Sequence, residues 1–427
     1  MNAPLPVPLP LPAVATADGA AVAGRHAATP TAPAPQPFET ALVRGLTVPL
    51  VGGNQVELLQ DGPCTHDAML EAIAAARHHI NLESYIFEAD GPGEEFARRL
   101  VERARAGVQV NVLFDGFGSL LTPTSYFDHL RAHGVHVCEA NPLSRLGNLL
   151  DRALHLRDHR KLLVVDGRVA FIGGVNISAV YSSGSTPLAG RHAAADARRG
   201  WRDTHVRLQG PAVAHLQRLF LRHWSRHGGC SIYPAGYFPP LAPVGTQRVA
   251  IAAREAGRHG SPFYRALLTA IGAARHRILL TTAYLVPTRR LMRALVQAAR
   301  RGVDVQLLLP GVSDFWAPLA AGRSHYAQLL RAGVRLHERH DTLLHAKTCV
   351  IDGTWTTVGS SNLDWRSLVH NAEANVIVLD GGLGQEMERV FAQDVANAVT
   401  IERDAWRQRG WRQRLLELVA RRFEFFL

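Results

Sequence analysis

The chain has little cysteine: it holds four such residues among its 427. None of the four, which are Cys64, Cys138, Cys230 and Cys349, stands at the paired spacing of a disulfide framework or a zinc site. We interpret them as core or loop thiols of a protein from a reducing compartment, and we predict neither a metal nor a cofactor. Long apolar runs are missing as well. Because a membrane-spanning helix needs roughly eighteen or more consecutive apolar residues, we predict no transmembrane helix.

Charge is scarce at the N-terminus, where residues 1–40 are mostly proline, alanine and threonine. This composition predicts a disordered leader. The leader lacks a basic region followed by an apolar one, so we expect no signal peptide. An acidic excess is absent too, since the net charge is +11 and the pI is near 10.1. Such a balance favours attraction to nucleic acid or to an anionic lipid surface, and an ordinary solvated surface explains it equally well.

What the chain does contain is one motif written twice. Histidine, lysine, aspartate, glycine and asparagine recur at identical offsets in two places: His159, Lys161, Asp166, Gly173 and Asn176, then His345, Lys347, Asp352, Gly359 and Asn362. A single histidine–lysine pair on a strand would carry little weight. The duplication indicates function, because packing does not require an imidazole and an ammonium twice on matching faces.

Each copy predicts a hairpin. The apolar segments after Lys161 and Lys347 are typical of buried strands, on which His159 and Lys161 share a face, as His345 and Lys347 do. Both strands end in Asp-Gly, so Asp166 and Asp352 are either catalytic residues or residues that fix the turn.

The return strands, 169–172 and 355–358, lead to small residues. At Gly174 and Ser360 the backbone can approach a ligand closely. Asn176 and Asn362 then offer an amide that can donate to a phosphate oxygen.

The similarity between the halves extends further. Ala75–Ile80 resembles Ala273–Ile278, and helix ends capped by glycine precede apolar strands in both halves, for example at Gly107 and Gly302. We predict helices near 94–106, 288–301 and 324–332 between strands 80–86, 110–114, 277–284 and 305–309. The sequence therefore predicts an α/β fold of two homologous domains, each a mixed, mostly parallel sheet flanked by helices, with the active site at their interface. We place the leader at 1–40, the domains at 41–235 and 236–400, and a basic amphipathic segment at 401–427.

Two imidazoles and two ammonium groups suit a phosphodiester. One neutral histidine can attack phosphorus and form a phosphohistidine, while the other, protonated, gives its proton to the departing alkoxide. Lys161 and Lys347 would stabilise the charge on the phosphate oxygens. Asp203 and Glu373 occupy corresponding places about thirty residues beyond each motif, where they can orient the histidines through the second ring nitrogen.

The paired motifs resemble those of the phospholipase D superfamily. Longer phrases, such as Leu82–Phe87, Val112–Ser119 and Thr357–Asp364, make the chain similar to the bacterial cardiolipin synthases of the shorter, non-spanning type, cardiolipin synthase B. The resemblance covers nearly everything from about residue 53 to residue 394.

The resemblance implies transfer of a phosphatidyl group between two phosphatidylglycerol molecules, which yields cardiolipin and glycerol. It implies His159 as nucleophile and His345 as acid and base, although the near symmetry of the site leaves the order open. It also implies that Asp203 and Glu373 each orient the histidine of the opposite half. The expected partners are phosphatidylglycerol and a membrane surface at the cytoplasmic face, with peripheral attachment and no nucleic acid.

Residues 411–427 place Trp411, Leu415, Leu418 and Phe423 at helical spacing among basic residues, as interfacial helices do, and a terminal helix packed on the second domain is the equal alternative. Segment 143–156, a mixture of leucine and arginine, is either a border of the site or an ordinary helix.

Other functions stay open: hydrolysis of a phospholipid, cleavage of a nucleic acid, and binding of a polyanion without catalysis. The chain lacks a clear single-strand track of aromatic and basic residues, and both motifs are complete, which disfavours the last two.

Overall fold

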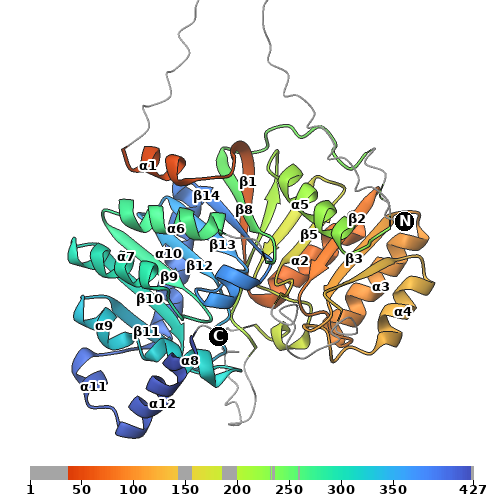
Figure 1. Cartoon of the computed structure of the whole chain (residues 1–427). Helices are drawn as coiled ribbons and strands as arrows, with labels where there is room; N and C mark the ends of the chain where they lie inside the picture. Colours follow the sequence, from red (N-terminus) through yellow and green to blue (C-terminus); the bar gives the residue numbers. More distant parts are fainter. Residues whose placement is uncertain are drawn as a thin grey trace, which may run out of the picture. The chain divides into compact units, whose positions relative to one another are not determined.

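The computed structural model describes residues 37–142, 156–184, 200–230, 232, 236–257 and 260–424. In this part of the chain, strands and helices alternate along the sequence, and the strands form one large mixed sheet flanked by helices (Figure 1). The predicted α/β class is confirmed. Most of the predicted leader, nearly all of segment 143–156 and the last three residues of the chain lie outside the described residues.

The described residues contribute 15 strands to the sheet, in the order β15-β11-β10-β9-β12-β13-β14-β8-β1-β7-β6-β5-β2-β3-β4. The first half supplies β1 (Leu50–Gln60), β2 (His79–Ser84), β3 (Gln109–Asp115), β4 (His136–Ala140), β5 (Lys161–Val165), β6 (Val169–Gly173) and β7 (Thr204–Gln209). The second half supplies β8 (Gln247–Arg254), β9 (Arg277–Thr281), β10 (Asp304–Pro310), β11 (Arg335–Arg339), β12 (Thr348–Ile351), β13 (Trp355–Gly359), β14 (Glu373–Leu379) and β15 (Ala398–Thr400). Because β1 pairs with β8, the sheet continues from one half into the other.

The direction of the strands differs from the prediction. Parallel pairing is confined to β2–β3–β4 in the first half and β9–β10–β11 in the second. The remaining neighbours in the sheet pair antiparallel. The expectation of a mostly parallel sheet is therefore wrong, and the reason lies in the motif itself: each copy is a hairpin, and a hairpin always adds antiparallel strands.

The described residues form the helices α1 (Pro37–Gly45), α2 (Asp61–Ala75), α3 (Gly91–Arg105), α4 (Thr124–Ala132), α5 (Val213–Arg226), α6 (Pro262–Ala273), α7 (Arg289–Arg300), α8 (Trp316–Arg323), α9 (Tyr326–Arg331), α10 (Gly381–Ala396), α11 (Arg403–Arg407) and α12 (Trp411–Arg422). The three helices predicted near 94–106, 288–301 and 324–332 correspond to α3, α7 and α9 to within a few residues, and the rest are further helices. The side chains of Asp90 and Thr288 accept backbone N–H groups at the starts of α3 and α7. Gly107 and Gly302 follow the ends of these helices with φ of +86° and +89°, as expected for glycine caps.

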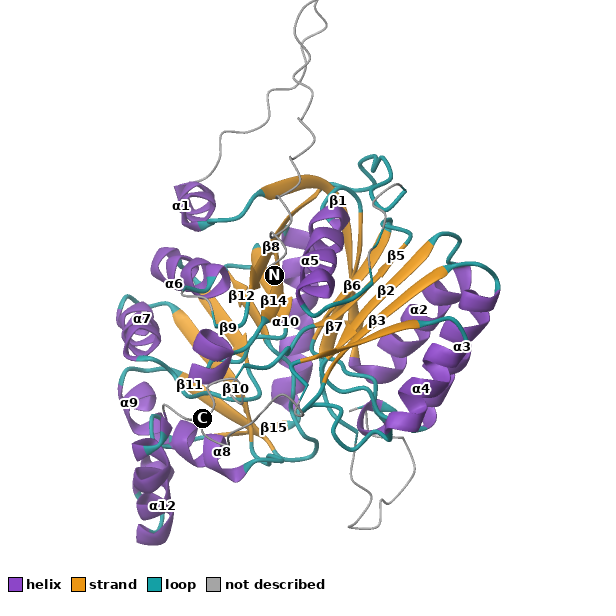
Figure 2. Cartoon of the chain, turned by 45° about the vertical axis from the view of Figure 1, so that its right-hand side comes forward, coloured by secondary structure: helices purple, strands orange, loops and turns teal. Residues whose placement is uncertain are grey.

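Three buried clusters hold the sheet and helices together. One packs α2, α3 and α4 against the first-half strands, and a second packs α6, α7 and α9 against the second-half strands. Figure 2 shows these helices on the outer faces, with α5 and α10 between the two arms of the sheet. The third cluster joins the halves, since it combines Phe220 of α5 and Phe391 of α10 with Leu162 and Val350 from the two motif strands. The domain limits given above stay a prediction.

Candidate active site

Each repeated motif forms a hairpin, β5–β6 in the first half and β12–β13 in the second. Asp166 and Asp352 sit in the turns, with φ of +53° and +50°. The carboxylate of Asp166 accepts the backbone N–H groups of residues 77, 78 and 79, and that of Asp352 accepts those of residues 275, 276 and 277. Both turns lie at the ends of β5 and β12 remote from the lysines. These contacts support the second of the two expected roles, in which the aspartates fix the hairpin turns; a catalytic role for them stays a prediction.

The two histidines are tied to the opposite halves by their backbones. His159 donates its N–H to the carbonyl of Ala372 at 3.0 Å, and His345 donates to the carbonyl of Arg202 at 2.8 Å. Short parallel bridges join residue 158 to Ala372 and residue 344 to Arg202. Ala372 and Arg202 directly precede Glu373 and Asp203. The chain therefore brings each histidine to the carboxylate of the other half.

The side chains complete this exchange. Nδ1 of His345 lies 2.6 Å from Oδ2 of Asp203, and Nδ1 of His159 lies 3.3 Å from Oε2 of Glu373. A carboxylate accepts hydrogen bonds, so each histidine carries its proton on Nδ1 and leaves Nε2 with a free electron pair. All four side chains are buried or nearly so, and the imidazoles keep only 12% and 7% of their surface exposed.

Gly174 and Ser360 contact these carboxylates. A Cβ at Gly174 would lie 2.1 Å from Oδ1 of Asp203, so only glycine leaves room for that side chain. At the matching place in the second half, the hydroxyl of Ser360 donates to Oε2 of Glu373, and the carbonyl of Ser360 lies 3.2 Å from Nδ1 of His159. Both residues therefore contact the carboxylates in the structure. The predicted contact of their backbones with a phosphate stays a prediction.

The two asparagines differ from each other. Oδ1 of Asn176 accepts the N–H of Ile86, and its amide donates to the hydroxyl of Tyr181, so its side chain is occupied by the fold. The side chain of Asn362 makes no hydrogen bond among the described residues and its Oδ1 is buried, so its NH₂ group is free to donate to a ligand. A substrate contact therefore fits Asn362 better than Asn176, whose predicted role in binding phosphate the contacts do not support.

The lysines lie buried beside the histidines. Nζ of Lys161 donates to the carbonyl of His159 at 2.7 Å, and Nζ of Lys347 donates to that of His345. Burial lowers the pKa of Lys161 to about 7 and that of Lys347 to about 8, against the pull of Glu373 and Asp203. Each ammonium also lowers the pKa of the opposite histidine, which means that the two motifs share one electrostatic environment.

Burial, then the neighbouring lysine of the same motif, lowers the pKa of both His159 and His345. Burial would raise the pKa of Asp203, but His345 beside it holds that pKa at about 2. Both imidazoles are therefore neutral near pH 7 in the free protein, and Asp203 is ionised. A bound phosphate anion would restore the proton to one of them.

Aromatic side chains pack beside both histidines. The analysis of the sequence motifs did not assign these aromatic residues to the histidines. The ring of Tyr85 lies 4.9 Å from that of His159, and Nζ of Lys161 lies over the same tyrosine. Trp201 lies 5.0 Å from His345, whose Nδ1 is also 3.1 Å from the hydroxyl of Tyr181. Trp201 is two residues before Asp203 and Tyr181 five after Asn176, so proximity to assigned residues was the only available signal.

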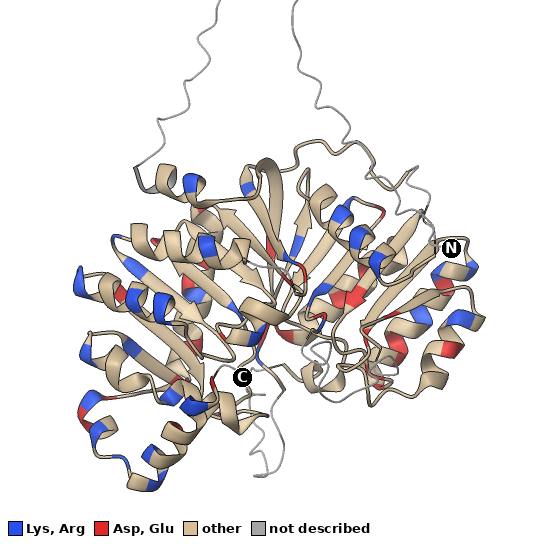
Figure 3. Ribbon diagram, viewed as in Figure 1, with Lys and Arg blue, Asp and Glu red and all other residues tan. Residues whose placement is uncertain are grey.

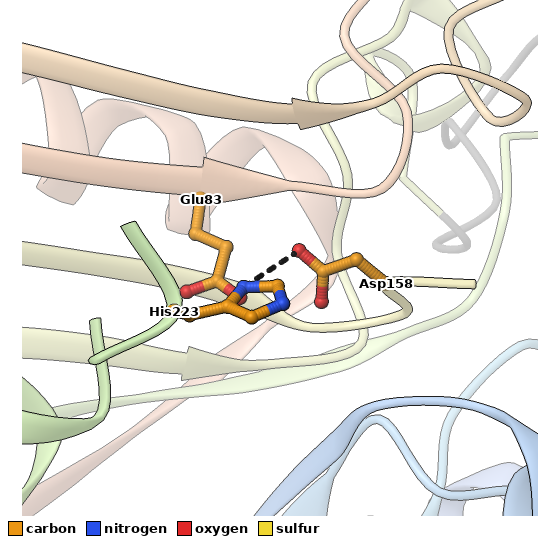
Figure 4. A group of neighbouring side chains, drawn as sticks. All are labelled: Glu83, Asp158 and His223. Carbon is orange, nitrogen blue, oxygen red and sulfur yellow. Dashed lines mark hydrogen bonds and ion pairs between the residues drawn. The ribbon is translucent and has the colours of Figure 1, made fainter. Parts of the chain in front are cut away.

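A second buried group lies behind His159. Nδ1 of His223 on α5 is 2.9 Å from Glu83 on β2 and 3.5 Å from Asp158 (Figure 4). The guanidinium of Arg160 lies 3.4 Å from Glu83. Burial raises the pKa of both carboxyl groups, and burial lowers that of His223 to about 4. The three ligand atoms are close enough for a metal ion, while Arg160 already supplies a positive charge at that place.

The comparisons with known proteins agree with this geometry. A family model described as "Cardiolipin synthase, PLD-like domain" matches residues 69–184 and 267–395, one segment in each half. The cardiolipin synthase of Geobacillus kaustophilus is 33% identical over 397 residues, which cover 92% of this chain and 76% of the relative. Cardiolipin synthase A of Pseudomonas aeruginosa is 36% identical over 364 residues, covering 84% of this chain and 70% of that protein.

Among solved structures, the crystal structure of phosphatidylserine synthase from Haemophilus influenzae superimposes with a TM-score of 0.65. It covers 92% of this chain and all of that one, at 12% sequence identity. At that identity the likeness concerns the fold. The relatives bear the names cardiolipin synthase and cardiolipin synthase A, so the narrower likeness to the type B enzymes stays a prediction.

Proposed function

The chain belongs to the cardiolipin synthases of the phospholipase D superfamily, and we propose that its two histidines move a phosphatidyl group from one phosphatidylglycerol to a hydroxyl of another. The activity is that of a phosphatidyltransferase. The observation that carries the proposed mechanism is the crossed pairing of His345 with Asp203 and of His159 with Glu373. It leaves Nε2 of each imidazole free for the reaction.

In the first step, Nε2 of His159 attacks phosphorus and the bond from phosphorus to the glycerol oxygen breaks. His345, charged at that stage, gives its Nε2 proton to the departing oxygen, so that glycerol leaves neutral. In the second step, His345 takes the proton of a hydroxyl on a second phosphatidylglycerol. That oxygen attacks phosphorus, the bond to His159 breaks, and cardiolipin is released.

Two contacts support this order of roles. The short contact of His345 with Asp203 stabilises an imidazolium, as an acid requires. Glu373 is shared between His159 and Ser360 and lies farther from its histidine, so His159 keeps less of that stabilisation and remains neutral for attack. Lys161, Lys347 and the amide of Asn362 then stabilise charge on the phosphate oxygens.

We also propose peripheral attachment to a membrane through α12. Among the described residues, no helix has the length and apolar character needed to cross a bilayer. On α12, Trp411 and Leu418 expose 70% and 65% of their surface, whereas Glu417 and Ala420 are buried against neighbouring elements. The predicted apolar face thus points away from the fold, as an interfacial helix requires. Attachment at the cytoplasmic side stays a prediction.

The purified chain, incubated with vesicles of acyl-labelled phosphatidylglycerol, tests the proposed function. We expect cardiolipin and glycerol in equal amounts, and the same products from Cys349→Ser, which alters a buried thiol that takes no part in the reaction. Phosphatidic acid alone would show that water is the acceptor, and no product would contradict the proposal. Quenching in alkaline detergent, which preserves a phosphohistidine, with phosphorus-labelled lipid and then peptide mass spectrometry at alkaline pH distinguishes a label on His159 from one on His345.

A further inference from the structure

Two loops occupy matching places after parallel strands of the two halves. One follows β3, which ends at Asp115, and the other follows β10, which ends at Pro310. Each strand lies between two parallel neighbours, and the first residue of each loop donates its N–H to the neighbouring strand, to Ala140 and Arg339 respectively. The loops are therefore equivalent by the internal repeat.

Both loops expose large apolar side chains at the same offsets from the strand end. In the first loop these are Phe117, Leu120 and Leu121, exposed by 48%, 58% and 87%; in the second they are Val312, Phe315 and Trp316, exposed by 42%, 48% and 57%. Single exposed apolar residues are common on protein surfaces. Six of them, placed at the same offsets in the two halves, indicate a surface that contacts a partner.

The first loop is connected to the first motif. The carboxylate of Asp115 accepts the N–H groups of Phe117 and Gly118 and, through its other oxygen, the N–H of Asp158. Asp158 directly precedes His159. The loop and the histidine are thus held by one side chain.

The second loop is connected to the second motif in a different way. The carboxylate of Asp314 accepts the hydroxyl of Tyr284 at 2.6 Å, and the carbonyl of Tyr284 accepts the N–H of Leu363 at 3.2 Å. Leu363 follows Asn362. The two loops therefore border the same site, one from each half.

Charge near the loops suits an anionic partner. Arg157 lies over the ring of Phe117 at 5.0 Å. Helix α8 begins at Trp316 and packs against α12. A groove of about 540 Å³ between α7 and α12 is lined by Arg289, Arg293, Arg421 and Arg422, with Glu424 as its one acidic lining residue among the described residues. Figure 3 shows basic residues along both α7 and α12.

We propose that these two loops, defined by residues 117–121 and 312–316, insert together into an anionic phospholipid bilayer and hold the site at the level of the headgroups. The inference rests on the proposed function, because the phosphodiester of a lipid lies at the interface. A site that takes this phosphate from an intact bilayer needs apolar groups on both sides that reach past the headgroups. A pair of loops, one from each half, supports the site mouth from both sides.

The test uses the full chain, with Leu121→Ser and Trp316→Ser singly and together, and Val399→Ser as a matched control. Val399 is 56% exposed on the edge strand β15. On phosphatidylglycerol vesicles we expect the double variant to bind about tenfold more weakly, each single variant to fall between, and the control to bind as the parent does. The ratio of turnover on vesicles to turnover on short-chain, dispersed phosphatidylglycerol should fall by a similar factor in the double variant.

Unchanged vesicle binding by the double variant would overturn the inference. A second result would also overturn it: the parent chain is a dimer in ultracentrifugation, and the double variant is a monomer that binds vesicles as well as the parent does. Trp316→Phe adds a direct reading: vesicles should shift the parent's fluorescence to shorter wavelength more than that of the variant. If the parent binds vesicles through the loops but converts no lipid, the proposed function fails while the docking surface stands.

Discussion

The two halves of the active site follow one plan but hold their histidines differently. In one, the short side chain of Asp203 reaches His345 at 2.6 Å across a space that Gly174 keeps open. In the other, the longer side chain of Glu373 lies 3.3 Å from His159 and also accepts the hydroxyl of Ser360. The carboxylate of Asp203 makes a short contact with its histidine, whereas the carboxylate of Glu373 is shared between its histidine and Ser360. A nearly symmetric sequence motif thus produces two unequal bases.

A second difference lies behind the histidines. The first half buries Glu83, Asp158 and His223 together with Arg160, and the described residues of the second half hold no such charged group at the corresponding place. By the offsets of the repeat, Thr281, Leu344 and Ala346 occupy the positions of Glu83, Asp158 and Arg160. Charges buried in this way fix geometry through several hydrogen bonds, whereas apolar packing does not prescribe orientation. The two motifs therefore differ in the residues packed around them as well as in the carboxylates that they contact.

Removing either histidine is the strongest test of whether the halves act as one site. We expect His159→Ala and His345→Ala each to lower the transfer rate by about 10⁴-fold, since nucleophile and acid are both required in every cycle. The measurement is cardiolipin formation on vesicles, with thermal unfolding as the control for folding. Substantial transfer by either variant would show that one half suffices, and the comparison of paired half-sites would collapse.

Changing the carboxylates sharpens the comparison. We expect Asp203→Asn to lower kcat by about a hundredfold and Glu373→Gln by about tenfold, because the amide cannot stabilise the imidazolium and only His345 depends on a close carboxylate for that charge. Steady-state kinetics on phosphatidylglycerol vesicles give both values. Equal losses, or a larger loss at Glu373, would reverse the roles assigned to the two histidines.

The sequence predicted much of this site because its information is local. His159 and Lys161 share a strand face, and the Asp-Gly turns require a hairpin, so spacing alone gave these elements. Corresponding positions in a repeat also predicted that Asp203 and Glu373 belong with the histidines. In the structure, each histidine contacts the carboxylate of the other half. The family resemblance implied this crossed pairing, but the spacing of the residues alone does not predict it.

Other features were beyond the sequence because they depend on tertiary contacts. The sequence left the aspartates of the motif as either catalysts or turn residues, and the three backbone amides around each carboxylate support the turn role. Asn176 and Asn362 are identical in the motif, yet only Asn176 has its side chain bonded within the fold. The charged group around His223 joins α5 to β2, elements that no short pattern connects.

The lysines give a pH dependence that separates this site from an exposed one. A lysine with a lowered pKa carries charge below that pKa and loses it above, here at about 7 for Lys161 and about 8 for Lys347. If both ammonium groups bind the phosphate, kcat/KM falls as the pH rises through this range, by about tenfold per pH unit between the two pKa values and by about a hundredfold per unit above both. Assays from pH 5 to about 10 at constant ionic strength measure it. A rate that stays level to about pH 9.5 would mean that the lysines are dispensable or fully charged.

The smallest expected effect is on folding stability and concerns another pair of equivalent residues, His205 and Asn375. Each follows the carboxylate residue of its half by two positions. The amide of Asn375 donates to Ser361, whereas both ring nitrogens of His205 are buried without partners among the described residues. Burial lowers the pKa of His205 to about 3. The folded chain therefore keeps this histidine neutral down to that pH, while the unfolded chain binds a proton below about 6.5.

It follows that His205 costs the folded state stability as the pH falls below 6.5, and that His205→Asn removes this loss. At pH 5 the difference amounts to about 2 kcal/mol relative to pH 8. Urea unfolding at the two pH values measures the free energy of unfolding for the parent and the variant. His129→Asn, at an exposed position, serves as the control and should leave the difference between the two pH values as in the parent. If the free energies of unfolding of the parent and of His205→Asn differ by the same amount at both pH values, water or a ligand already forms hydrogen bonds with the imidazole ring. The two half-sites would then be alike at this position.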